Sequence, residues 1–425
     1  MPNNACLIIA GDIDIPQTKK WVHEYFGWIP KGPLVPRDIP AEPEQTQARS
    51  LIIYKPNVPL TNIFMGFKTA DYRSDDHYAL QMLSDILASG QTGRLDRQFV
   101  NSAEPSCVEV GADDQRLEDV SFFLVEAVVQ QGKAPDDVQK QILAAIYELA
   151  DKGVTQEELD KVRTQTLDAI IESRQTCASI ATELGDQQVF GGDAERVNRM
   201  IKKINALTPA DIQAVAKKYI QPQRLTAVQY RPDPLGINAR KAAALAAIAS
   251  AKATETKNAG VVPSTEPIAQ RVQNFPSGYP TEPPTPAGPP HVVFNKGVEQ
   301  TVNGLNLITL SDHHLPLVNV SLIMPGGGEA QPPDKTGVDS TTAEMLSRGS
   351  AGIPFLQLAD DLESRGISID ASAEVDTTRL VISCVTDQLD YAVKRANQML
   401  ASPDFPAEEF DKLKQQSLGE LMQSL

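Results

Sequence analysis

One stretch of this 425-residue sequence is unsuited to a globular core, namely residues 236–290. Lys241–Ala253 is nearly all alanine with a few Leu, Ile, Lys and Ser residues, and this composition predicts a short helix. Nine prolines follow, at positions 263, 267, 276, 280, 283, 284, 286, 289 and 290. Proline at this density disfavours helix and sheet and favours extended backbone. We therefore interpret residues 236–290 as a semi-rigid connector between two globular parts, 1–235 and 291–425.

Composition limits the partners of the two parts. With 39 Lys and Arg against 55 Asp and Glu, the formal net charge is −16, which argues against nucleic acids and anionic membranes, since both require basic surfaces. No apolar run approaches the ~18–20 residues that span a bilayer, and the first residues do not resemble a signal peptide. The four cysteines are scattered, and we interpret them as small buried residues. They do not indicate whether the protein works in an oxidising or a reducing compartment.

The part before the connector alternates predicted strands and helices. Ser74 is a candidate helix cap, Thr155 with Glu158 forms a capping box before a long helix through Leu184, and Thr208 opens another helix. Apolar runs rich in β-branched residues predict strands at Cys6–Ala10, Leu51–Tyr54, Ile63–Thr69, Val120–Val129 and Leu225–Tyr230. The pattern predicts an α+β fold.

A weak internal repeat links the two parts. The same short pattern occurs in both parts: Glu-Glu, an apolar residue, Asp-Lys and a second apolar residue. It lies within Val154–Arg163 and within Phe405–Lys414. Each follows a predicted strand and an amphipathic helix, at Ser121–Val129 and Val138–Leu149 in the first copy and Arg379–Val385 and Leu389–Leu400 in the second. The order indicates one α+β unit used twice. The second copy stops at Leu425, inside its long helix, so we expect it to be truncated.

The residues taken alone give no catalytic site and no metal site. A helical zinc site needs two histidines at i and i+4, and none of the five has this spacing: His23, His77, His291, His313 and His314. No G-x-S-x-G motif is present, and Pro325–Gly328 matches no phosphate-binding motif, so we interpret it as a turn. The acidic pairs Asp113-Asp114 and Asp360-Asp361 are expected on solvated faces or at helix caps.

Several segments together resemble the pitrilysin/insulinase family of zinc metallopeptidases, the inverzincins, whose catalytic signature is H-x-x-E-H. The segments are Pro2–Asp12, Val22–Pro30, Gly93–Leu95, Pro316–Gly328 and Asp334–Val338. The resemblance implies metallopeptidase-like α/β sandwich units, each an antiparallel-rich sheet with helices packed on one side. Residues 1–235 would be the second unit of a first lobe, 236–290 the Pro/Ala-rich linker, and 291–425 the first, degenerate unit of a second lobe.

The resemblance also places the zinc motif. In active members, the helix that begins near Gly337 carries H-x-x-E-H. Here Ser340 and Glu344 stand at the two histidine positions, Ala343 stands at the catalytic glutamate, and Glu420 lies near the distal glutamate ligand. One or two carboxylates without imidazole do not make a tetrahedral zinc site with an open water position. We therefore expect no catalytic residue and no metal ligand in this chain, and zinc only in the parent enzyme.

The implied function is part of a zinc-dependent endopeptidase. The chain would contribute scaffold and a wall of the peptide chamber, and would be inactive alone because the catalytic half-lobe lies upstream of Met1. The implied partners are a peptide or unfolded protein and the missing half-lobe or a homologous subunit. Exported members of the family imply the periplasm. The alternatives are a non-catalytic core or interaction subunit of the same fold and an unrelated α+β binding module.

Overall fold

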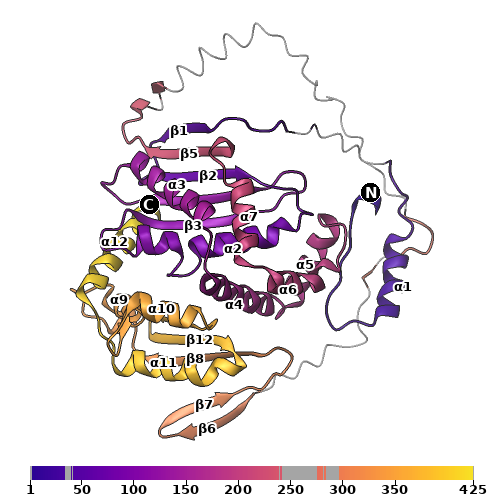
Figure 1. Cartoon of the computed structure of the whole chain (residues 1–425). Helices are drawn as coiled ribbons and strands as arrows, with labels where there is room; N and C mark the ends of the chain where they lie inside the picture. The colour runs from indigo at the N-terminus through magenta and orange to yellow at the C-terminus, as the bar shows by residue number, and fades with distance from the viewer. Residues whose placement is uncertain are drawn as a thin grey trace.

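A computed structural model describes residues 2–33, 40, 42–238, 240–241, 275–280, 282–283 and 296–424 (Figure 1). Most of the connector lies outside these residues, and so does the helix expected at Lys241–Ala253, apart from Lys241. We call Arg49–Pro232 the first unit and Val298–Ser424 the second unit. No described helix is long and apolar enough to cross a membrane.

The first unit is built on a five-stranded sheet with the strand order β1-β5-β2-β4-β3. The strands are β1 (Arg49–Lys55), β2 (Asn62–Lys68), β3 (Cys107–Gln115), β4 (Phe122–Val129) and β5 (Leu225–Pro232). Only β1 and β5 pair in parallel, and every other neighbouring pair is antiparallel. This is the antiparallel-rich sheet that the resemblance implies.

Helices cover one face of this sheet. Alternate residues of β2, namely Ile63, Met65 and Phe67, are fully buried and form one core with the apolar sides of the helices, as a strand with a single covered face requires. The helices are α2 (Asp76–Ala88), α3 (Pro135–Lys152), α4 (Gln156–Ser173), α5 (Cys177–Val189), α6 (Arg196–Ala206) and α7 (Pro209–Tyr219), with a π-helical turn η2 (Asp96–Val100) and a 3-10 turn η3 (Pro222–Arg224).

The second unit has a three-stranded antiparallel sheet, with the order β11-β12-β8, and a separate hairpin, β6 with β7. Its strands are β6 (Val298–Val302), β7 (Leu305–Thr309), β8 (Leu317–Pro325), the two-residue β9 (Gly349–Ser350) and β10 (Ile353–Pro354), β11 (Ser368–Ala373) and β12 (Thr377–Val385). Its helices are α9 (Val338–Met345), α10 (Phe355–Glu363), α11 (Leu389–Ala401) and α12 (Ala407–Ser424), with 3-10 turns η4 (Gly328–Ala330) and η5 (Thr386–Gln388).

The two units repeat one order of elements. The series β2, α2, β3, β4, α3, α4 in the first unit corresponds to β8, α9 with α10, β11, β12, α11, α12 in the second. The helices α4 and α12, which carry the repeated sequence, are both 18 residues long. The sheet order β2-β4-β3 is likewise matched by β8-β12-β11. Both units are therefore copies of one α+β arrangement.

An arginine–glutamate pair stands at the same place in both units. Arg94 donates two hydrogen bonds to Glu158, at 2.7 and 2.9 Å, and this bidentate pair ties the segment before η2 to the start of α4. At the repeat-equivalent glutamate, Glu409 of α12, Arg348 lies 3.8 Å away. The pKa of Glu158 is lowered to about 2, because Arg94 and the amide and hydroxyl of Thr155 outweigh the effect of burial. The repeat thus preserves an ion pair as well as a chain path.

Each unit's second long helix reaches the other unit. Lys161 of α4 donates to Asp360 of α10 at 3.1 Å, and Arg97 pairs with the same carboxylate at 2.8 Å. On the other side, α12 packs against β3 at Gly419, where a Cβ atom would come within 2.8 Å of Val108. The absence of a side chain at Gly419 permits this close approach. We call the contact between α4 and α10 the seam.

Several sequence-based predictions need correction. Cys6–Ala10 is extended but pairs with no strand in the described part of the chain, so the strand predicted there is wrong. The helix expected to run to Leu184 ends at Ser173, because Thr176 caps a new helix by accepting from the amide of Ser179. The capping boxes at Thr155 and Thr208 are confirmed. The cap expected at Ser74 is displaced by one residue, because the N-cap of α2 is Asp75.

The few described residues of the connector pack on the N-terminal segment. Phe275 and Tyr279, its two aromatic residues, stack at 4.5 Å between ring centroids, and both contact Trp28 edge-on. Tyr25 of α1 (Ile15–Phe26) donates to the carbonyl of Glu282 at 2.8 Å. This stretch of the connector therefore forms a small apolar cluster of its own, which its proline content alone does not predict.

Candidate functional site

The helix α9 carries three of the four positions that the resemblance assigns to the zinc motif. It begins after Gly337, whose φ of 91° suits a residue without a side chain. Ser340 and Glu344 are exposed and lie one turn apart on the same face. Ala343 is 2% exposed and belongs to the packed side of the helix. The two histidine positions therefore face outward together, whereas the glutamate position faces the interior.

The fourth position, Glu420, lies on α12, which packs against α9. Partial burial of its carboxyl group raises the pKa of Glu344, and the negative charge of Glu420 raises it further. The two carboxylates therefore lie close enough to interact. Arg348 lies near both, stacks on the ring of Phe355 at 4.4 Å, and donates to Gln416 of α12 at 3.2 Å.

These residues do not fit a catalytic zinc ion. Catalytic zinc in peptidases is held by at least two imidazoles, often with one carboxylate, and keeps one position for water, whereas here the donors are one hydroxyl and two carboxylates, beside the cation Arg348. Across the described ranges, no group of three or more His, Cys, Asp or Glu is placed to hold a metal ion. We derive no metal-dependent step for this chain.

None of the described histidines lies on α9 or α12. His77 is buried, with Nδ1 2.7 Å from Asp114 Oδ2 and Nε2 2.8 Å from the carbonyl of Asp71. Both ring nitrogens have oxygen partners, so neither is free for a metal. Asp114 also accepts from Arg116 at 3.0 Å, so this residue is part of a buried network, not of the solvated face expected. His23, His313 and His314 are exposed, and His291 lies outside the described residues.

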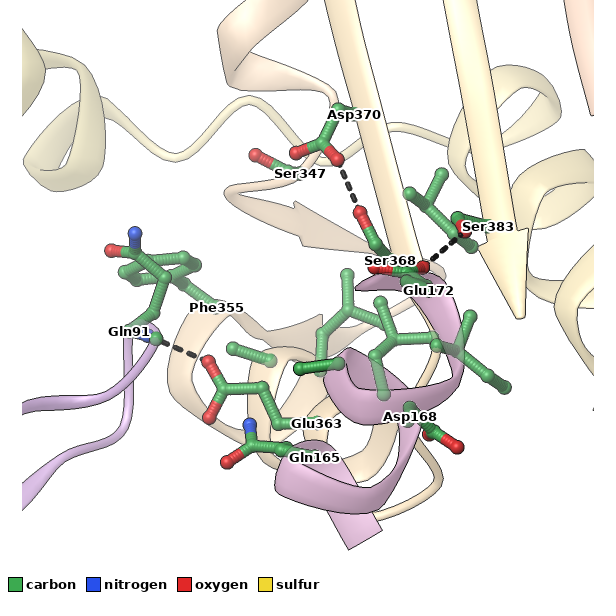
Figure 2. Close-up of a pocket in the computed structure, with 18 of the residues that line it drawn as sticks. Gln91, Gln165, Asp168, Glu172, Ser347, Phe355, Glu363, Ser368, Asp370 and Ser383 are labelled. Atoms are coloured by element: carbon green, nitrogen blue, oxygen red, sulfur yellow. Dashed lines mark hydrogen bonds between the residues drawn. The ribbon is translucent and has the colours of Figure 1, made fainter. Parts of the chain in front are cut away.

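A second candidate site is a cavity of about 420 Å³ at the seam (Figure 2). Gln165, Asp168 and Glu172 of α4 form one side, and Phe355 and Glu363 of α10 form the other. Glu363 accepts from the amide of Gln91 at 2.6 Å, and Glu172 accepts from the hydroxyl of Ser383 at 2.9 Å. The lining combines four carboxylates, the fourth of which is Asp370, with one cation, Arg348, and the apolar side of α10.

Carboxyl groups gather around this cavity, and burial raises the pKa of two of them. Burial raises the pKa of Asp168 to about 6, and the neighbouring Glu172 and Asp387 add to the shift. Asp96, at the start of η2, has its pKa raised to about 7 by burial, with Glu363 and Glu109 contributing. The carboxylate of Asp96 occupies the space that Gly93 leaves, because a Cβ there would lie 2.6 Å from Oδ2. Sequence reasoning missed this cavity and assigned Asp360 at the same seam to a solvated face.

Two models of one peptidase family match the chain. The peptidase M16 inactive domain matches residues 1–166, and the insulinase domain of peptidase family M16 matches residues 307–424. Together they cover most of the chain. The chain belongs to peptidase family M16. The resemblance to the pitrilysin/insulinase family drawn from the sequence is thereby confirmed.

Curated M16 relatives come from Helicobacter pylori. A protein named zinc protease PqqE is 24% identical over 233 residues, which are 54% of this chain and 52% of that protein. A protein named non-peptidase homolog YmxG is 26% identical over 112 residues, or 26% of each chain. This chain thus spans about half the length of the first relative and about a quarter of the second.

A solved structure supports the fold. This chain aligns with the crystal structure of a protease from Helicobacter pylori with a TM-score of 0.50 and 24% sequence identity. The alignment covers 52% of this chain and 54% of that one. The mixed α/β units with antiparallel-rich sheets are therefore M16 peptidase-fold units. The match of residues 1–166 to an inactive M16 domain identifies a pitrilysin-like scaffold.

Proposed function

We propose that this chain is the non-catalytic scaffold of a two-lobed M16 zinc endopeptidase. In this proposal residues 1–235 and 291–425 are two M16 units joined by a linker, 236–290, and both units form part of the wall of a peptide chamber. The observation that carries the proposal is the sequence of α9, which contains no histidine: Ser340 and Glu344 stand where the resemblance implies the two histidines of H-x-x-E-H. The zinc, its activated water and the general base would belong to another M16 unit, in the same polypeptide or in a partner subunit.

The charge of the seam suggests a class of peptide. Asp168, Glu172, Glu363 and Asp370 line the cavity with a single cation, Arg348, and the chain as a whole carries a formal charge of −16. A wall with an excess of one charge sign concentrates ligands of the opposite sign. We therefore propose that the chamber favours unfolded peptides that carry Lys or Arg.

A second candidate function is a core subunit that binds a partner without forming part of any peptidase. The name of the relative YmxG, non-peptidase homolog, favours this possibility. The two candidates differ in one respect. A scaffold increases the activity of a catalytic unit, whereas a core subunit binds its partner and leaves that activity unchanged.

The test combines this chain with an M16 unit from the same genome that carries an intact H-x-x-E-H motif. We expect the chain to raise kcat/KM for a basic quenched peptide by about tenfold or more, since a completed chamber positions the substrate. A peptide in which Lys and Arg are replaced by Glu should gain less.

The matched control is the same catalytic unit with the glutamate of its own motif changed to glutamine, which should stay inactive with or without the chain. Binding without any increase in activity would contradict the scaffold and support the core subunit.

A further inference from the structure

The two units contact each other twice, through corresponding helices of the repeat. Ten residues after the glutamate that both helices share, α4 carries Asp168 and α12 carries Gly419. A Cβ atom at Gly366, two residues before β11, would overlap Oδ2 of Asp168. A Cβ atom at Gly419 would lie 2.8 Å from Val108 of β3, the strand that corresponds to β11. The same point of each helix therefore meets the start of the corresponding strand in the other unit.

The contact at Gly419 is apolar and closely packed. Leu60, Val108 and Val128 of the first unit are buried together, and Met422 of α12 packs against them. Without a side chain at Gly419, the backbone of the helix lies directly on the strand. Burial of apolar surface does not depend on the protonation of acidic groups, so we expect this contact to hold at any moderate pH. We call it the fixed contact.

The contact at Asp168 is polar and lies beside the seam cavity (Figure 2). Here the glycine is on the opposite side, and Gly366, with a φ of 65°, leaves room for the carboxyl group of Asp168. Oδ2 of Asp168 is buried and has no hydrogen-bond partner in the described part of the chain. A carboxylate in such a place loses hydration without gaining a donor, whereas a neutral carboxylic acid loses less. A proton on Asp168 therefore favours the closed contact.

The groups around Asp168 also disfavour its ionisation. Burial, Glu172 on the next turn of α4 and Asp387 of η5 together raise the pKa of Asp168 to about 6. The other titratable or charged groups around the cavity are Glu363 of α10, Asp370 of β11, Cys384 of β12 and the cation Arg348. Acidic groups thus face Asp168 from its own helix and from the second unit.

The cations of the seam pair with other carboxylates. Arg348 lies 3.8 Å from Glu409, and Lys161 donates to Asp360 at 3.1 Å. Despite burial, the pKa of Asp360 is lowered, because Lys161 and Arg97 stabilise its charged form. The pair of Lys161 with Asp360 therefore persists over the pH range in which Asp168 titrates, and it holds the beginning of α4 in place.

We propose that the seam is a proton-controlled gate, in which ionisation of Asp168 moves the C-terminal half of α4 away from the turn at Gly366 and opens the seam cavity. The helix α12 stays on β3 at the fixed contact, and the pair of Lys161 with Asp360 remains. Protonation of Asp168 lets the carboxyl group return to its buried place and closes the cavity. The inference rests on the contacts between the units and is independent of the proposed function.

Two pairs of spin labels compare the gate with the fixed contact. One pair, Q175C/T386C, lies just beyond the end of α4 and on η5, and the other, A103C/S417C, lies before β3 and on α12. All four residues are exposed, and C6S/C177S removes the two exposed native thiols.

The pKa of Asp168 sets the size of the expected response. It is about 6 in the closed contact against an ordinary value of 3.8, so opening should be about tenfold more favourable at pH 8 than at pH 5. We expect the distances between the labels of Q175C/T386C to shift to longer values at pH 8. The distances of A103C/S417C should stay unchanged.

Two variants assign the response to Asp168. D168N keeps the shape of the side chain and cannot ionise, so it should show the short distance at both pH values. E157Q is the matched control, because Glu157 is exposed on the same helix, and it should respond to pH as the unchanged chain does. The proposal is overturned if the distance at the seam does not change with pH, if D168N responds like the unchanged chain, or if both label pairs respond equally.

Discussion

Replacing Ser340 and Glu344 with histidine is expected to give this chain a zinc site. The two positions lie one turn apart on the exposed face of α9, and Glu420 of the adjoining α12 is close enough to influence the pKa of Glu344. S340H/E344H would complete a set of two histidines and one glutamate, which binds zinc in peptidases. We expect bound zinc to rise from well under one to about one ion per chain, measured by metal analysis after gel filtration.

Two further variants make this result specific. Adding E420Q to S340H/E344H should remove most of the bound zinc, because the third ligand is lost. S340H/T342H carries the same number of histidines at a spacing that points them to different faces of the helix, and it should bind no more zinc than the unchanged chain. Equal zinc in both histidine pairs would contradict the assignment of α9 to the zinc-motif position.

Changing Asp96 to asparagine is expected to stabilise the first unit at alkaline pH. Burial raises the pKa of Asp96 to about 7, and its Oδ2 has no hydrogen-bond partner in the described part of the chain. Because the folded pKa exceeds the unfolded value near 3.8, the stability contributed by the neutral acid is present below about pH 4 and is lost as the pH rises to about 7. D96N removes this loss, so we expect a gain of about 2 kcal/mol at pH 8.

Urea denaturation at pH 5 and pH 8 measures this effect. The gain of D96N should be about two to three times larger at pH 8 than at pH 5, since only part of the range between the unfolded and folded pKa values of Asp96 has been crossed at pH 5. D137N is the matched control, because Asp137 is 68% exposed on α3 of the same unit, and its replacement should change stability little at either pH. A gain independent of pH would show that Asp96 is not held neutral by burial.

Much of the fold follows from local sequence signals. The capping boxes at Thr155 and Thr208 and the repeated core in α4 and α12 locate helices, because caps and apolar spacing act within a few residues. The strand β3 was missed because acidic residues and Gly111 interrupt its alternation. Its Asp114 is buried in a pairing with Arg116, two residues on, and with His77, which lies 37 residues earlier in the sequence.

The two candidate sites also differ in how far they can be predicted from the sequence. The positions on α9 were found through family resemblance, since their significance lies in residues that are absent. The seam cavity could not be predicted, because Asp168 and Glu363 are separated by almost two hundred residues and no local pattern records their contact. The strand predicted at Cys6–Ala10 shows the complementary failure, in which a strong β-forming segment has no described neighbour to pair with.

The most direct test of the central claim is the zinc content and peptidase activity of the unchanged chain alone. The chain would be purified from zinc-supplemented medium, and then assayed for bound metal and for chelator-sensitive cleavage of a quenched basic peptide. A scaffold without its own catalytic motif predicts well under one zinc ion per chain and no chelator-sensitive cleavage. One tightly bound zinc ion per chain, together with cleavage that a chelator abolishes, would contradict it.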